Sequence, residues 1–216
     1  MTKRWKVCGL RDSENIQSVV DLQPDFVGFI FYAPSPRYAG GQLEVKTTSR
    51  IEQRIKKVGV FVNAAEEEIL NLNNKFGLDY IQLHGSESVA FCAQLKNKDL
   101  KLIKAFPVDH QFNFKSTASY AQVTDLFLFD TKTPKFGGSG QSFNWTRLNE
   151  YNGSQPFLLG GGINPENALE ALEIDHPKMI GIDVNSRFET KPGTKNLNML
   201  LELQKTLKRL NNKASV

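Results

Sequence analysis

"KVGVFVNAAEEEILNLNNKFGLDYIQLHG", Lys57–Gly85, contains a complete strand–helix–strand unit. Its first part, KVGVFV, is a short apolar run typical of a buried strand. A helical pattern follows, in which Asn63 is suited to cap the helix, and DYIQLHG predicts the next strand. Consecutive strands joined by a helix predict parallel pairing with a right-handed crossover.

The same alternation continues along the 216 residues of the chain. The other apolar runs are WKVCG, FVGFIFY, LKLIKAF, LFLFD, PFLLGGG and KMIGIDV. A helical pattern follows each of the eight runs, and those after the fifth and sixth are the weakest. Eight such units in roughly 200 residues suffice for a closed barrel. A doubly wound open sheet is the alternative, but its GxGxxG fingerprint is absent after the first strand.

We therefore predict an α/β protein with a single domain, a (β/α)8 TIM barrel over residues 1–216. Residues 211–216, which are mostly polar or small, are expected to form a frayed tail.

Composition and charge disfavour several classes of protein. The net charge of +4 comes from scattered basic residues, whereas a nucleic-acid-binding protein usually concentrates them in a stripe. Cys8 and Cys92 form no CxxC pair and no metal-ligand spacing with the three histidines. The N-terminal stretch turns polar too early for a signal peptide, and no apolar run approaches the ~18 residues of a membrane span. We expect a cytoplasmic protein that binds a small anionic molecule, with no nucleic-acid or membrane partner and no metal.

Polar residues stand where the predicted strands end. In such barrels this edge carries the active site. These residues are Cys8, Arg37, Asn63, Gln82, His84, Asp130, Gly160, Gly161, Gly162, Asp183 and Asn185. The sequence thus predicts a polar mouth on an apolar barrel.

Two of the loops are rich in glycine. In GGGINPEN, Gly160–Asn167, small residues precede a helix expected near Pro165, a pattern suited to binding phosphate together with the neighbouring segment DVNSRFE. Alternatively, the glycines only form a tight turn. The segment FDTKTPKFGGSGQSFNW, Phe129–Trp145, is a candidate lid. Asp130 at its start is a candidate acid or base, or else a structural residue that caps the loop or pairs with Lys132.

Three other strand-end residues have two readings each. Arg37 follows two prolines, and a guanidinium on a stiff loop suits a carboxylate, although it could also stack on Tyr38 at the surface. Cys8 is either a small buried residue or a reactive thiol. If it faces the mouth, Lys6 lies one layer beneath it and favours the thiolate. His84 is either a substrate contact or a core residue.

Seven segments appear in an order that resembles one family. They are KVCGL, GFIFYAPSPRY, VGVFVN, IQLHGSE, FDTKTPKFGGSGQSFNW, GGGINPEN and IDVNSRFETKPGTKN. From Lys6 to about Asn196 the chain resembles the phosphoribosylanthranilate isomerases of tryptophan biosynthesis. Members of this family are (β/α)8 barrels without a cofactor, and they are monomers or homodimers. They convert N-(5-phosphoribosyl)anthranilate to 1-(2-carboxyphenylamino)-1-deoxyribulose 5-phosphate by an Amadori rearrangement.

The resemblance implies a role for each matching residue. Cys8 is the expected general base, Asp130 the general acid and Arg37 the ligand of the anthranilate carboxylate. The phosphate is expected to be bound by Gly161, Gly162, Asn185 and Ser186. Gln82, His84 and Asp183 are further expected substrate contacts. The chemistry requires Asp130 to be protonated while Cys8 is ionised.

One segment departs from the family. Relatives often carry DVSSG after the eighth strand, whereas this chain carries DVNSR, so that Arg187 either assists phosphate binding or points outward. Two rival functions are another phosphosugar barrel enzyme, such as an epimerase or an enzyme like indole-glycerol-phosphate synthase, and a non-catalytic phosphate-ligand binder. The presence of both Cys8 and Asp130 favours the isomerase over either rival.

Overall fold

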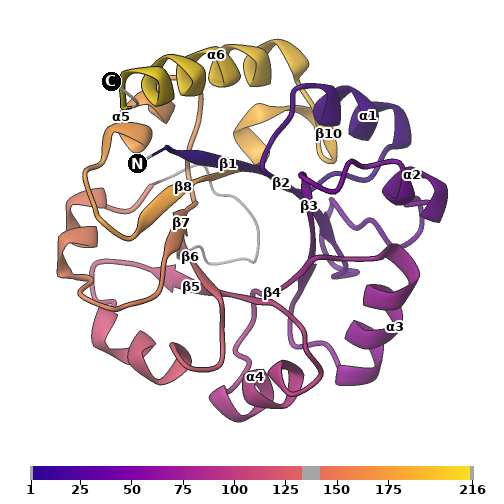
Figure 1. Ribbon diagram of the computed structural model, residues 1–216, viewed down its shortest axis with the longest axis horizontal. Helices are drawn as coiled ribbons and strands as arrows, with labels where there is room; N and C mark the ends of the chain where they lie inside the picture. Colours follow the sequence, from indigo (N-terminus) through magenta and orange to yellow (C-terminus); the bar gives the residue numbers. More distant parts are fainter. Residues whose placement is uncertain (1, 133–141, 215–216) are drawn as a thin grey trace.

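The chain forms a closed barrel of eight parallel strands (Figure 1), here described for residues 2–132 and 142–214 of a computed structural model. The strands are β1 (Arg4–Val7), β2 (Phe26–Ile30), β3 (Lys56–Phe61), β4 (Tyr80–Leu83), β5 (Leu102–Val108), β6 (Leu126–Thr131), β7 (Phe157–Leu159) and β8 (Met179–Val184). Each strand pairs with the next, and β8 pairs with β1 in parallel. This closure confirms the predicted (β/α)8 barrel and excludes the open sheet.

Helices surround the barrel on the outside (Figure 1). The α-helices are α1 (Ser13–Asp21), α2 (Val45–Ser49), α3 (Glu66–Phe76), α4 (Val89–Lys96), α5 (Ala168–Glu173) and α6 (Leu197–Ala214). The weak patterns after the fifth and sixth strands form short 3₁₀ helices, η1 (Phe114–Tyr120) and η2 (Trp145–Glu150). Helix α6 includes residues 211–214, part of the segment that was expected to fray.

Two helix starts differ from the prediction. Asn63 does not cap α3, because its backbone has a φ of +50° and its Oδ1 accepts a hydrogen bond from the Ser86 N–H. Helix α5 begins at Ala168 rather than near Pro165. Before it, the chain makes a turn in which Asn164 Oδ1 accepts hydrogen bonds from the N–H groups of Glu166 and Asn167.

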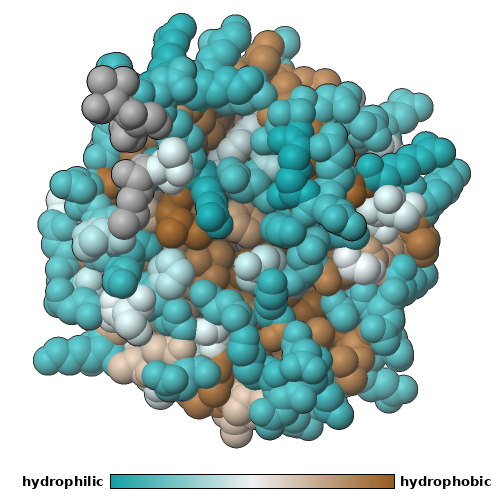
Figure 2. All heavy atoms as spheres, in the orientation of Figure 1, coloured by the Kyte–Doolittle hydropathy of each residue, from teal (hydrophilic) through white to brown (hydrophobic). Residues whose placement is uncertain are grey.

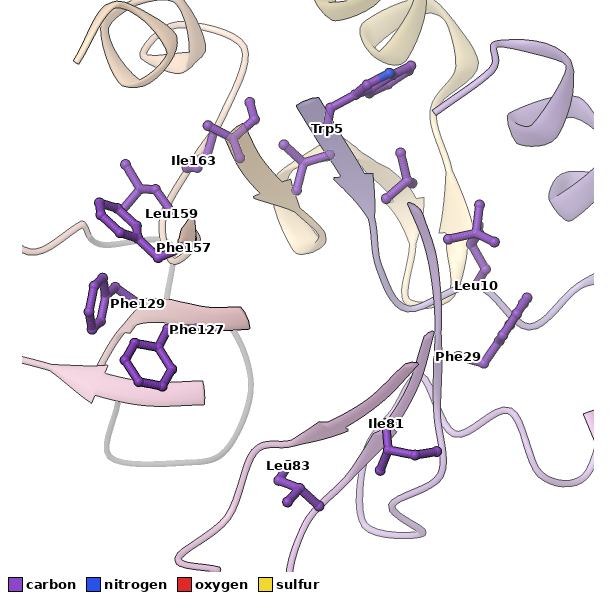
Figure 3. Close-up of a cluster of buried hydrophobic side chains, with 14 of the residues drawn as sticks. Trp5, Leu10, Phe29, Ile81, Leu83, Phe127, Phe129, Phe157, Leu159 and Ile163 are labelled. Carbon is purple, nitrogen blue, oxygen red and sulfur yellow. The ribbon is translucent and has the colours of Figure 1, made fainter. Parts of the chain in front are cut away.

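Side chains alternate between the barrel interior and the layer beneath the helices. On β6, Leu126 and Leu128 belong to the interior cluster, while Phe127 and Phe129 pack in the outer layer (Figure 3). The interior cluster comprises Phe26, Val58, Ile103, Ala105, Leu126, Leu128 and Leu158. Asp130 has the same parity as Leu128, so it extends the interior row toward the strand's C-terminal end.

The segment after β8 adds structure that the sequence did not predict. It forms a short 3₁₀ helix, η3 (Ser186–Phe188), and then a hairpin of β9 (Glu189–Lys191) and β10 (Thr194–Lys195). The turn contains Gly193 with a φ of +85°. Polar side chains dominate the periphery of the face seen in Figure 2, and hydrophobic ones show between them near its centre. Within the described ranges, no helix has the length and apolarity to cross a membrane.

Candidate functional site

A pocket of about 300 Å³ opens where the barrel strands end. Nine of the ten predicted site residues line it: Cys8, Gln82, His84, Asp130, Gly161, Gly162, Asp183, Asn185 and Ser186. Apolar walls come from Ile30, Val60 and Pro107. The tenth residue, Arg37, is not part of this lining.

The two-residue period of the strands explains this convergence. Lys6 and Cys8 alternate with Trp5 and Val7, which pack in the outer layer. Gln82 and His84 alternate in the same way with the outward-facing Ile81 and Leu83. Because the barrel strands are parallel, residues at their C-terminal ends meet at one mouth.

A base-side cluster consists of Cys8, Lys6 and Asp183. The Lys6 ammonium is fully buried and donates to both carboxylate oxygens of Asp183, each at 3.0 Å. Lys6 also interacts with the Cys8 thiol by charge and hydrogen bonding. Gly28 on β2 makes room for the thiol, since a Cβ at this glycine would lie 2.8 Å from Cys8 Sγ.

The charge balance at Cys8 differs from the prediction. Burial raises the pKa of the Cys8 thiol, and the attraction of Lys6 offsets this effect only in part. The negative charge of Asp183 adds to the rise of that pKa. The expected ammonium is therefore present and favours the thiolate as predicted, but burial of the thiol outweighs it, so that the pKa of Cys8 lies above its ordinary value.

This raised pKa has a direct chemical test. In the Cys92→Ser variant, alkylation of Cys8 by iodoacetamide should accelerate with rising pH, with a midpoint above that of a free cysteine, because only the thiolate reacts. The rate is measured by mass spectrometry across the alkaline range. In Cys8→Ser the fully buried Cys92 should react negligibly. A midpoint at or below that of free cysteine would contradict the charge balance described above.

An acid-side cluster consists of Asp130, His84 and Gln82. Asp130 Oδ2 lies 3.0 Å from His84 Nε2, and His84 Nδ1 lies 2.9 Å from Gln82 Nε2. Asp130 Oδ1 accepts a hydrogen bond from the Thr131 N–H at 2.9 Å. The carboxyl group is thus held in one orientation from two sides.

The glycines after β7 pack closely against this carboxyl group. Gly161 has a φ of +79°, and a Cβ there would lie 2.2 Å from the Thr131 nitrogen and 2.6 Å from Asp130 Oδ1. A side chain at this position would strain the backbone and displace Asp130. Helix α5 begins only at Ala168, so the expected helix N-terminus does not follow the glycines directly.

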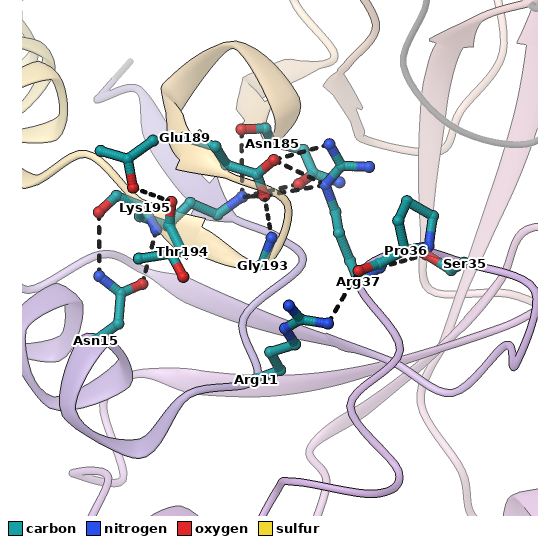
Figure 4. Close-up of polar contacts among 11 residues, drawn as sticks. Arg11, Asn15, Ser35, Pro36, Arg37, Asn185, Glu189, Gly193, Thr194 and Lys195 are labelled. Atoms are coloured by element: carbon teal, nitrogen blue, oxygen red, sulfur yellow. Dashed lines mark hydrogen bonds and ion pairs between the residues drawn. The ribbon is translucent and has the colours of Figure 1, made fainter.

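Arg37 belongs to a buried cluster beside the pocket (Figure 4). Its Nε donates to both oxygens of Glu189, at 2.9 and 3.0 Å, and its Nη2 donates to Oε2 at 2.7 Å. Lys195 pairs with the other side of Glu189 at 2.7 Å and donates to Asn185 Oδ1 at 2.8 Å. Burial alone would raise the pKa of Glu189, but Arg37 and Lys195 together hold it below its ordinary value.

Sequence reasoning missed two buried lysine–glutamate pairs. Glu189 and Lys195 face each other across the β9–β10 hairpin, for which the Pro–Gly turn in ETKPGTK was an available signal. Lys104 pairs with Glu87 at 3.0 Å and donates to the carbonyls of Leu83 and Gly85, and so fixes the loop after β4. A lysine within the apolar run LKLIKAF was the signal for this pair.

Two predictions concern residues outside this pocket, and a third concerns metal binding. The candidate lid falls largely on residues 133–141, outside the described part of the chain. Arg187 is exposed and does not line the pocket. Among the described residues, no group of three or more His, Cys, Asp and Glu side chains is arranged to hold a metal ion.

A closed (β/α)8 barrel with a thiol, a carboxyl group and a glycine wall at its strand ends is typical of the barrel enzymes, whose active sites lie at this edge. Residues 5–206 match the sequence profile of the N-(5′-phosphoribosyl)anthranilate (PRA) isomerases. The chain belongs to this family.

Individual relatives are similar to this protein in sequence or structure over nearly the whole chain. The N-(5′-phosphoribosyl)anthranilate isomerase of Parabacteroides distasonis is 44% identical over 196 residues, which cover 90% of this chain and 89% of that protein. The crystal structure of phosphoribosyl anthranilate isomerase from Thermotoga maritima superposes with a TM-score of 0.84 at 31% identity, and covers 96% of this chain and 100% of its own. A further isomerase structure, in complex with reduced 1-(o-carboxyphenylamino)-1-deoxyribulose 5-phosphate, has a TM-score of 0.81 at 27% identity, with 96% of this chain and 100% of the other covered.

Proposed function

We propose that the protein isomerises N-(5-phosphoribosyl)anthranilate to 1-(2-carboxyphenylamino)-1-deoxyribulose 5-phosphate in tryptophan biosynthesis. The observation that carries this proposal is the presence of Cys8 and Asp130 in one pocket, each within its own cluster of polar side chains. The family membership and the product analogue bound by a related structure support the same reaction.

Two anchors orient the substrate in this proposal. The phosphate binds at the wall formed by Gly161, Gly162 and Ser186, where backbone N–H groups can approach an anion closely. Arg37 uses its Nε and Nη2 edge for Glu189, and among the described residues none accepts a hydrogen bond from Nη1. This second edge of the guanidinium is the one that would bind the anthranilate carboxylate.

Ring opening is the first chemical step. Protonated Asp130 donates its proton to the furanose ring oxygen, the bond from this oxygen to C1′ breaks, and the nitrogen lone pair forms a C=N⁺ bond. The His84 Nε2–H, 3.0 Å from Asp130 Oδ2, stabilises the carboxylate that results.

Proton abstraction follows. The Cys8 thiolate removes the proton from C2′, the electron pair forms the C1′=C2′ bond, and the nitrogen regains its lone pair. The enolamine then gains a proton at C1′ and loses one from the C2′ hydroxyl to become the ketone. The raised pKa of Cys8 makes it a strong base once it is ionised, and the iminium charge next to C2′ acidifies the proton to be removed.

A fluorescence assay tests the reaction. N-(5-phosphoribosyl)anthranilate is formed in situ from anthranilate and phosphoribosyl pyrophosphate, and its loss of fluorescence is followed after the protein is added. Turnover well above the spontaneous loss, with the aminoketose phosphate identified by mass spectrometry, supports the proposal. A folded protein without turnover would contradict the proposed reaction, and other phosphosugars would then be tested as substrates.

Glu189 allows a separate prediction about substrate binding. Glu189→Gln removes the charge that orients Arg37, so KM should rise about 10-fold or more while kcat changes less. The melting temperature should also fall, because Lys195 loses its buried partner. Steady-state kinetics are measured well below that temperature. Glu150→Gln, which breaks the exposed Arg147–Glu150 pair, should leave KM unchanged. An unchanged KM in Glu189→Gln would show that Arg37 does not depend on Glu189.

A further inference from the structure

Gln82, His84 and Asp130 form a row of close polar contacts that ends on the proposed acid. Gln82 is 1% exposed on β4, and its Nε2 lies 2.9 Å from His84 Nδ1. His84 Nε2 lies 3.0 Å from Asp130 Oδ2, and both side chains are 28% exposed. All three line the pocket, but Gln82 is almost fully buried in the barrel wall, while the other two are partly exposed.

The row determines which nitrogen of His84 carries the proton. An amide nitrogen only donates hydrogen bonds, so His84 Nδ1 must accept through its lone pair. The ring proton then resides on Nε2, the nitrogen that lies 3.0 Å from Asp130 Oδ2. In this tautomer the only ring N–H of His84 is on the side of the carboxyl group.

The opposite orientation of the Gln82 amide is disfavoured. Exchanging its oxygen and nitrogen would force a proton onto His84 Nδ1 and move the N–H₂ group to the position of Oε1. Oε1 is buried, and no described residue forms a hydrogen bond with it. Leaving a single carbonyl oxygen there is less costly than leaving amide N–H groups without an acceptor.

We propose that Gln82 is a positioning residue that keeps the proton needed for ring opening on Asp130 by holding His84 in its neutral Nε2–H form. This inference rests on the proposed isomerase reaction. If Nδ1 could take up a second proton, the pair would become an imidazolium beside a carboxylate, and Asp130 would have no proton to donate. Protonation of Nδ1 requires the hydrogen bond from Gln82 to break, so the amide opposes this transfer.

His176 provides a built-in reference for the measurement. Its Nδ1 accepts from the Lys178 N–H at 3.1 Å, and its Nε2 lies 3.0 Å from the Tyr151 carbonyl. It is therefore held in the same tautomer, but by the backbone and outside the pocket. The chain has only three histidines, so their signals can be resolved.

The first arm of the test is ¹⁵N NMR of the full-length protein labelled at histidine, with His84 assigned by its loss in His84→Gln. In the wild-type protein, His84 should give an unprotonated Nδ1 and a protonated Nε2, as His176 does. In Gln82→Glu, the carboxylate accepts rather than donates, so the His84 Nδ1 should become protonated while the His176 signals stay in place. A protonated His84 Nδ1 in the wild type, or an unchanged His84 in Gln82→Glu, would overturn the proposal.

The second arm is kinetic. Gln82→Glu should lower kcat about 10–100-fold, by analogy with the range found when the hydrogen-bond partner of a metal-binding histidine is replaced, with KM changed less than about twofold. In the His84→Gln background, the same Gln82→Glu change should lower kcat less than about threefold, because the histidine through which it acts is gone. Equal losses of kcat in both backgrounds, or a rise in KM alone, would assign Gln82 to structure or to substrate binding and overturn the proposal.

Gln82→Met covers the case in which the buried charge of Gln82→Glu unfolds the protein. It removes the donor without adding a charge, and Nδ1 should then become open to protonation with a smaller loss of kcat. The NMR measurement does not require turnover. Failure of the proposed reaction can therefore be distinguished from failure of the proposed role of Gln82. Absence of isomerase activity with the expected tautomer would overturn the proposed function but leave the control of His84 by Gln82 standing.

Discussion

Replacing Cys8 with alanine is expected to lower kcat about 10³–10⁴-fold, the upper part of the range for a general base, while KM stays nearly unchanged. The thiol lines the pocket next to Lys6, so its loss removes the proposed base without removing an anchor of the substrate. The structural cost should be small, because the change removes only the sulfur atom from the side chain. The fluorescence assay at saturating substrate measures the loss.

Cys92→Ala is the matched control for this experiment. Cys92 is the other cysteine of the chain and is fully buried on α4, outside the pocket lining. Its replacement should lower the melting temperature but leave kcat within about twofold, since it touches no group that reacts. If Cys8→Ala keeps a tenth or more of the activity, another group is the base, and Asp183 is next to be tested because its carboxylate faces the same pocket.

Replacing Asp130 with asparagine is expected to lower kcat about 10³-fold or more, because the amide has the shape of the acid but no proton of suitable acidity to donate. Asparagine keeps one side-chain oxygen, which can accept from the Thr131 N–H or face His84 but cannot do both, so the fold and the binding of substrate should persist at a small cost in stability. Steady-state kinetics and the melting temperature, measured together, separate a lost acid from a lost structure.

The control for this change is Asp109→Asn, which removes a carboxylate paired with Lys132 at 2.7 Å and outside the pocket lining. It should leave kcat within about twofold, since its ion pair is largely exposed. Activity of Asp130→Asn close to wild type would exclude the carboxyl group as the acid and leave His84 as the nearest proton donor in the pocket.

Barrel architecture was predictable because it depends on local patterns. Short apolar runs that alternate with helical patterns fix parallel strands, and the two-residue period then decides which residues face inward. Cys8, Gln82 and Asp130 therefore meet as expected. The 3₁₀ helices after β5 and β6 lie where the patterns were weakest.

Properties that depend on contacts between residues distant in sequence could not be predicted from local patterns. The pKa of Cys8 depends on how far the burial of the thiol outweighs the attraction of the Lys6 ammonium. A sequence does not show how much water reaches a site, so this balance could not be predicted. Arg37 looked available for a carboxylate, yet Glu189, 152 residues further along, occupies one edge of it. Asn63 appeared as a helix cap because its preference for that role is local, whereas its actual partner, Ser86, lies in the next loop.

The pairing of Lys6 with Asp183 also has a consequence for folding. These residues are 177 positions apart, and they meet only when β8 docks against β1. Contacts of such large sequence separation form late, since the loop-closure entropy must be overcome first. The acid-side cluster, from β4 and β6, joins strands that are close in sequence. During refolding, helical signal and the environment of His84 should therefore recover before catalysis, and the return of activity would report the moment at which the barrel closes.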